Sequence, residues 1–98
     1  MTTLAGYSPA TPCGYQQITN VSAAIGLTPP TTAPQLPVRA IIICTTQAVR
    51  WRDDGTDPSA TAGMPLPVNT PLVYDGDLKK IKFFEQAAGA VLNISYYY

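Results

Sequence analysis

Five aspartates in two short segments are the residues of this chain best suited to chemistry. Asp53, Asp54 and Asp57 form one group, and Asp75 and Asp77 form another around a glycine. Paired carboxylates can hydrolyse glycosides or hold calcium. The spacing Asp-Asp-Gly-Thr-Asp does not match the EF-hand loop, however, and tight turns prefer Asp and Gly on their own account. We therefore interpret both groups as turns rather than as catalytic or metal sites.

The single tryptophan, Trp51, lies between Arg50 and Arg52, just before the first acidic group. An aromatic ring beside carboxylates could stack on a sugar. Successive side chains of a strand point to opposite faces, so Trp51 shares its face with Val49 while both arginines point the other way. This alternation predicts that Trp51 packs in the core.

The chain contains no histidine, which removes the usual general base and the commonest metal ligand. A Ser-His-Asp or Cys-His arrangement is therefore impossible within one chain. Cys13 and Cys44 are too few for a disulfide framework or, without histidine, for a zinc site. Cys44 is expected to be a small buried hydrophobe, whereas a bridge between the two cysteines or between subunits stays open. We predict no enzyme activity, no cofactor and no metal site.

Length and charge narrow the function further. The 98 residues fit one domain, and 12% of them are charged, about half the usual ~25%, with a net charge of zero. Lys79, Lys80 and Lys82 are interpreted as a solvated strand face rather than a nucleic-acid site. No run reaches the ~18 apolar residues of a membrane helix, and the N-terminus lacks the pattern of a signal peptide. We expect no nucleic-acid or membrane partner, and synthesis in a cytoplasm.

Alternating patterns, turn signals and ten prolines predict an all-β fold without long helices. The predicted strands are 15–21, 39–46, 48–52, 72–74, 78–86 and 90–98, with 22–27 as a further short piece or a bend, and 56–70 is read as a long connection. We expect a small antiparallel β-sandwich or jelly-roll-like barrel of six to eight short strands, forming a single domain over 15–98. The predicted core is Ile42, Val49, Trp51, Ile81, Phe83, Leu92 and Ile94.

The first 38 residues carry no charged side chain, and all twelve charges fall between Arg39 and Glu85. Residues 1–14 lack periodicity and are predicted to form an extended N-terminal arm. Residues 28–37, with the sequence TPPTTAPQLP, are predicted to be a proline-rich linker within the domain. An uncharged arm can lie on a partner surface because it need not stay solvated. The composition therefore favours assembly over catalysis.

Seven apolar or aromatic residues are candidates for an interface. Ile41 and Ile43 point away from Ile42 in one continuous strand, so something other than the main core is expected to cover them. The chain ends in three tyrosines, for which subunit contact and core closure are both open readings. The candidate interface residues are Leu4, Tyr7, Leu36, Ile41, Ile43, Tyr97 and Tyr98.

Three segments carry a resemblance to a known group of proteins. They read VRWRDDGTDP from Val49, GMPL from Gly63 and LNISYY from Leu92. They resemble small proteins encoded in the structural regions of tailed bacteriophages and prophages, which share the pattern RWRDDGT-x-P, G-M-x-L and L-N-[VI]-x-Y-Y. The resemblance covers about half the chain, from Val49 to Tyr97. It implies a small all-β virion component and supplies no catalytic residues.

Our leading hypothesis is a capsid decoration (cement) protein of a phage head. Such a protein would bind the major capsid protein, or other virion proteins, as a homo-oligomer. It would reside in the virion after synthesis in the host bacterial cytoplasm. The alternative is a tail, head-fibre or adhesin module that binds host surface glycans, for which the acidic turns near Trp51 are the only candidates.

Overall fold

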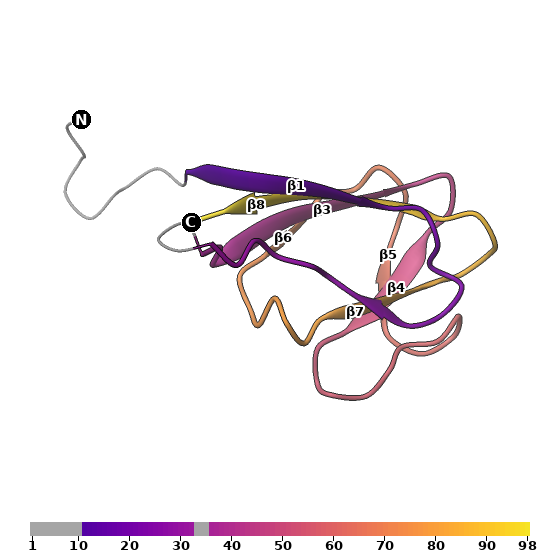
Figure 1. The fold of residues 1–98 in the computed structure, drawn as a ribbon. Helices are drawn as coiled ribbons and strands as arrows, with labels where there is room; N and C mark the ends of the chain where they lie inside the picture. Colours follow the sequence, from indigo (N-terminus) through magenta and orange to yellow (C-terminus); the bar gives the residue numbers. More distant parts are fainter. Residues whose placement is uncertain (1–10, 33–35) are drawn as a thin grey trace.

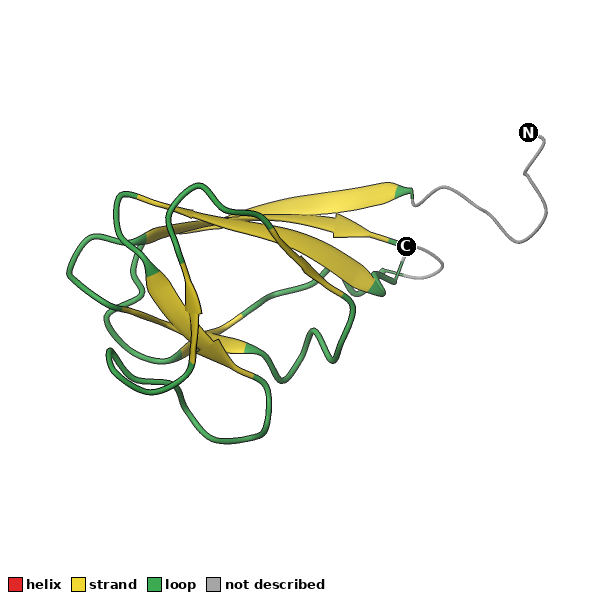
Figure 2. Cartoon of the chain, turned by 180° about the vertical axis from the view of Figure 1, so that it is seen from behind, coloured by secondary structure: helices red, strands yellow, loops and turns green. Residues whose placement is uncertain are grey.

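A computed structural model describes residues 11–32 and 36–98 (Figures 1 and 2). Every element of regular secondary structure in these residues is a β-strand. The all-β prediction is confirmed. The strands are β1 (Pro12–Ile18), β2 (Ile25–Gly26), β3 (Arg39–Thr45), β4 (Val49–Arg52), β5 (Met64–Leu66), β6 (Leu72–Tyr74), β7 (Lys82–Glu85) and β8 (Val91–Tyr97).

The strands form two four-stranded antiparallel sheets. One has the order β1-β8-β3-β6 and contains the three seven-residue strands, and we call it the long sheet. The other has the order β2-β7-β4-β5, and we call it the short sheet. Successive strands alternate between the sheets except for β4 and β5, which are neighbours. This is the strand order of an eight-stranded jelly roll. The number of strands agrees with the prediction of six to eight.

The core lies between the two sheets and follows the period-two pattern of the sequence. In β8, Leu92, Ile94 and Tyr96 are buried, and Ile94 pairs with the buried Ile42 of β3. Phe83 supplies the largest buried side chain of the short sheet. The predicted core residues are fully buried with one exception, Trp51, which is half-buried and packs against the core from its margin.

The first strand begins earlier than the sequence predicts, at Pro12 rather than Tyr15. The ladder extends even to residue 11, because Thr11 and Tyr98 exchange two backbone hydrogen bonds of 2.9 Å. A proline is tolerated as the first residue of an edge strand. At Gly14 an added β-carbon would lie 2.8 Å from Pro30 Cγ, so the proline-rich linker crosses close to the strand here. The remainder of the predicted arm, residues 1–10, lies outside the described residues.

Two other boundaries differ from prediction. Residues 56–70 contain β5, which pairs with β4 and places Pro65 on an edge strand, where a missing N–H is tolerated. The strand predicted over 78–86 is limited to β7. Lys79 and Lys80 therefore occupy the turn before the strand, and only Lys82 belongs to the strand face proposed for these lysines.

Replacing Phe83 with alanine should lower the free energy of unfolding by about 3–5 kcal/mol, because a large side chain is lost from a closed core. Phe84, half-buried on the opposite face of β7, provides the matched control. Urea denaturation should show a clearly smaller loss for Phe84→Ala. Equal losses in the two variants would contradict the assignment of faces.

Candidate functional site

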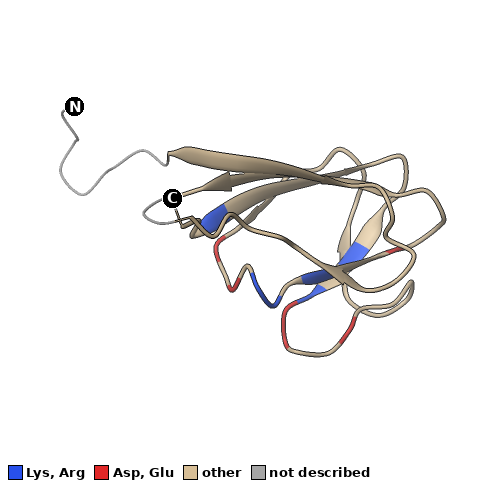
Figure 3. Cartoon of the chain, viewed as in Figure 1, with Lys and Arg blue, Asp and Glu red and all other residues tan. Residues whose placement is uncertain are grey.

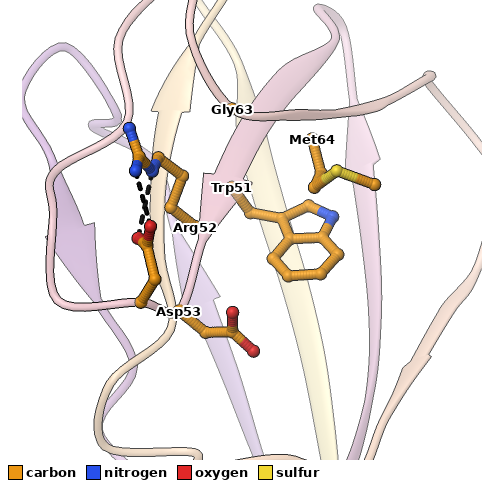
Figure 4. A pocket seen from close by; sticks show the side chains of 6 residues that line it. Trp51, Arg52, Asp53, Gly63 and Met64 are labelled. Atoms are coloured by element: carbon orange, nitrogen blue, oxygen red, sulfur yellow. Dashed lines mark hydrogen bonds and ion pairs between the residues drawn. The ribbon is translucent and has the colours of Figure 1, made fainter.

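An open pocket of about 440 Å³ lies where β4 ends and β5 begins (Figure 4). Trp51 on β4 pairs across the ladder with Met64 on β5, and these two side chains form its apolar wall. The connection between the strands supplies the rest of the lining. The lining residues are Trp51, Arg52, Asp53, Asp54, Gly63 and Met64.

Arg52 and Asp54 form a two-pronged ion pair on one side of the pocket. Arg52 Nε donates to Asp54 Oδ1 at 3.0 Å, and Nη2 donates to Oδ2 at 2.5 Å. This hydrogen bonding raises the pKa of Arg52 and lowers the pKa of Asp54. An exposed pair of this kind adds little to stability. Its effect is to fix the direction of the guanidinium at the rim.

Asp53 is held by a residue of the other sheet. Tyr74 Oη, from β6, donates a hydrogen bond of 2.7 Å to Asp53 Oδ2. Burial, followed by this hydrogen bond, raises the pKa of the Tyr74 phenol well above its usual value, so the phenol remains a donor. The Tyr74 ring also meets Trp51 edge to face, with centroids 5.9 Å apart. Tyr74 thus positions both the carboxylate and the indole.

The loop between β4 and β5 is anchored by Arg50. Its Nε donates to the Ala60 carbonyl at 3.2 Å, and its Nη1 donates to the Gly63 carbonyl at 2.9 Å. Gly63 has φ of 134°, and an added β-carbon would lie 3.1 Å from the Trp51 carbonyl oxygen. Glycine is required here because the loop returns tightly against β4.

Two of the five aspartates, Asp54 and Asp77, bond backbone N–H groups of the predicted turns, and Asp53 and Asp54 line the pocket. Asp54 Oδ1 accepts from the Thr56 N–H at 3.4 Å, and Asp77 Oδ1 accepts from the Lys79 N–H at 2.9 Å. Asp57 pairs with Lys82 at 3.1 Å. Within the described part of the chain, no cluster of three His, Cys, Asp or Glu residues could hold a metal ion.

A second candidate site is the outer face of the long sheet, the side turned away from the core. The register places Tyr15, Ser95, Ile41 and Val73 in one row across all four strands. Tyr15 is 66% exposed and Val73 is 63% exposed. Asn93 Oδ1 accepts from Tyr15 Oη at 2.8 Å. The outer face comprises Tyr15, Gln17, Arg39, Ile41, Ile43, Thr45, Val73, Val91, Asn93, Ser95 and Tyr97.

This outer face carries one charged side chain among the described residues, Arg39 at the start of β3, which the register places opposite Tyr97 at one end of the face. The other charges fall on the short sheet and on the loops, as the coloured segments of Figure 3 show. The sequence indicated an uncharged N-terminal region. The fold pairs it, through β1, with the equally uncharged β8.

The predicted interface residues separate into three groups. Ile41, Ile43 and Tyr97 come together, half-buried, on the outer face. Leu36 is exposed beside a second pocket of about 810 Å³ between the linker and residues 75–79, and Tyr98 is exposed where β8 ends. Leu4 and Tyr7 lie outside the described residues. Tyr96, next to Tyr97, is buried in the core, so core closure holds for one of the three terminal tyrosines.

Cys44 is a small buried core residue, as predicted. It is fully buried, and its Sγ donates weakly to the Leu66 carbonyl at 3.3 Å. Burial raises the pKa of this thiol, as expected for a core side chain. Cys13, half-buried on β1, is also a free thiol, so the two cysteines are not bridged to each other.

Comparisons of the chain with protein-family models, with curated proteins and with solved structures found no match. The described residues include no helix that is long and apolar enough to cross a membrane. Two surfaces of the described residues are candidates for function: the pocket beside Trp51 and the outer face of the long sheet.

We expect the protein to lose stability at alkaline pH, because Tyr74 and Tyr96 are buried. Burial raises the pKa of Tyr96 to about 12, and it raises the pKa of Tyr74 as well. Because an unfolded tyrosine titrates near pH ~10, this stabilisation is complete below that pH and declines as the pH rises through the native values. The urea concentration at the midpoint of unfolding should be lower at pH 11 than at pH 8. The Tyr74→Phe/Tyr96→Phe variant should show a smaller fall, and an equal fall would contradict the assignment.

Proposed function

We propose that this chain is a structural component of a bacteriophage virion, and specifically a capsid decoration protein that binds and stabilises the head lattice. The observation that carries the proposal is the outer face of the long sheet, which is accessible, rich in aliphatic and aromatic side chains, and charged only at Arg39 at one end. A face of this kind suits a permanent contact with another protein.

The cost of desolvation favours a protein contact through the outer face. Burying an unpaired charge is costly, and the cores of protein interfaces are depleted in charge and enriched in aromatic residues. The outer face presents Tyr15, Tyr97 and several aliphatic side chains, and its one ion, Arg39, lies at the end of the face, where it can stay in contact with solvent. Its polar members are also partly satisfied, because Gln17 Nε2 donates to Asn93 Oδ1 at 3.0 Å. Docking a partner here therefore buries apolar area at little polar cost.

The two sheets give the molecule two different sides. The charged residues of the short sheet and of the loops favour contact with solvent, while the outer face of the long sheet favours contact with protein (Figure 3). We infer that the long sheet faces the lattice and the short sheet faces outward. Copies of the chain would then repeat around a symmetry axis of the particle.

The assignment to a phage rests on the sequence resemblance, supported by analogy of fold. The shared pattern lies in β4, in the following loop, in β5 and in β8. Jelly rolls occur in viral capsid proteins, although they also occur in lectins and cupins, so the fold by itself does not determine function. The partner in this proposal is the major capsid protein, and no catalytic step is involved.

Copy number in purified particles tests the proposal directly. Quantitative gel densitometry or mass spectrometry should find the chain in amounts comparable to the major capsid protein. A few copies per particle would instead support a tail or head-fibre component. Absence from washed particles would refute a role in the virion.

Replacing Ile43 with aspartate should weaken particle binding at least about tenfold, equivalent to 1.4 kcal/mol, because the new charge must be desolvated. The same substitution should have little effect on the urea midpoint of unfolding, because Ile43 points away from the core. Gln86→Asp, in the exposed turn after β7, controls for added negative charge. Outright unfolding of Ile43→Asp, or binding equal to that of Gln86→Asp, would contradict the proposed contact.

A further inference from the structure

We propose that the pocket beside Trp51 binds a neutral sugar residue of a glycan, with Trp51 as the stacking surface and Asp53 as the hydroxyl acceptor. Sugar binding in this pocket would not require any particular position of the chain in a virion. It rests on four properties of the pocket: an aromatic wall, an accessible donor, an accessible acceptor and the sign of the local charge.

The aromatic wall is held in place and remains accessible. Tyr74 contacts the Trp51 ring at an interplanar angle of 69°, which fixes the indole from the side of the core. Figure 4 shows the indole between Met64 and the polar side chains of the loop. Met64 is 56% exposed and extends the apolar surface. A sugar ring has an apolar C–H face that can pack on such a surface.

The indole N–H is an available donor. No described residue accepts a hydrogen bond from Trp51, yet the described part of the chain contains no buried side-chain nitrogen or oxygen without a partner. The N–H must therefore reach solvent. Tryptophan N–H groups usually find an acceptor when they are covered. A sugar hydroxyl above the ring would supply that acceptor.

Asp53 is an available acceptor of fixed orientation. Tyr74 Oη occupies Asp53 Oδ2, and no described residue donates to Oδ1. An ionised carboxylate accepts only, with two lone-pair sites on each oxygen, so Oδ1 can accept from adjacent hydroxyls of a sugar. Arg52 is oriented by Asp54 through Nε and Nη2, which leaves its Nη1 hydrogens free to donate.

Charge separates neutral sugars from other ligands. The lining contains two carboxylates, on Asp53 and Asp54, and one guanidinium, on Arg52, so its net charge is −1. Phosphates, sialic acids and uronic acids would be repelled. A purely apolar ligand would desolvate Asp53 without replacing its hydrogen bonds. The volume of about 440 Å³ falls within the range of small-molecule sites, roughly 300–1,000 Å³.

Trp51 is the single tryptophan of the chain, so its fluorescence reports on the pocket directly. The full-length protein should be titrated with neutral oligosaccharides of glucose, galactose, mannose, rhamnose and N-acetylglucosamine, and with the matched pair lactose and sialyllactose. We expect a saturable fluorescence change with at least one neutral sugar, and at least tenfold weaker binding of acidic counterparts. A panel without any saturable response would overturn the proposal, and tighter binding of acidic sugars would overturn the assigned ligand class.

Variants then locate the site, with calorimetry as the readout. Asp53→Asn keeps the shape and an acceptor for Tyr74 but loses the charge, and it should weaken binding at least tenfold. Trp51→Phe, which keeps an aromatic ring for packing, should also weaken it. Asp75→Asn, an exposed carboxylate outside the pocket, is the control and should bind as the wild type. Wild-type affinity in Asp53→Asn and Trp51→Phe would place any sugar binding elsewhere. Particle copy number is a separate readout, so this proposal can fail while the decoration role stands.

Discussion

The pairing of β8 with both β1 and β3 is the interaction on which the rest of the structure depends. β8 lies inside the long sheet, with seven residue pairs to β3 and six to β1. Its inward side chains face the core, and its outward side chains join the rows of the outer face. Without β8, β1 would lose its ladder and β3 would keep only β6 as a neighbour. Because this central strand is the last in the chain, most of the structure depends on contacts between residues far apart in sequence.

The same pairing explains how a weakly charged chain produces two distinct surfaces. The N-terminal region and the C-terminal strand are both uncharged, and the fold places them side by side in one sheet. The charged middle of the chain forms most of the short sheet and the loops. Two uncharged segments that are far apart in the sequence thus form one continuous surface only after folding.

Period-two patterns were sufficient to predict the fold where strands are long and paired on both sides. Residues 91–97 and 39–45 show such patterns, and the residues of these strands that were predicted to be buried are buried, namely Ile42, Cys44, Leu92 and Ile94. The pattern failed where proline and glycine occur in edge strands, as at Pro12, Gly14 and Pro65. In those places the neighbouring strand or linker, which the local sequence does not specify, decides the conformation.

The pocket could be predicted only in part, for a related reason. The proximity of Trp51 to the acidic turn is visible in the sequence, but its degree of burial is not. Trp51 shares a face with Val49, yet it lies farther along β4, toward the end of the short sheet, where the core no longer covers it completely. The contributions of Tyr74 and Met64 come from other strands and depend on the register.

The hydrogen-bonded pair of Thr11 and Tyr98 has a mechanical consequence. These residues lie at the same end of the antiparallel β1–β8 ladder, whose hydrogen bonds run across the strands. A tension applied between them would pull along those bonds and break them one after another, as a zipper opens. A tension applied along β8 against β3 would load the hydrogen bonds of that ladder together. The resistance of the domain to force therefore depends on where the force is applied, with the sheet interior strong and the outermost pair weak.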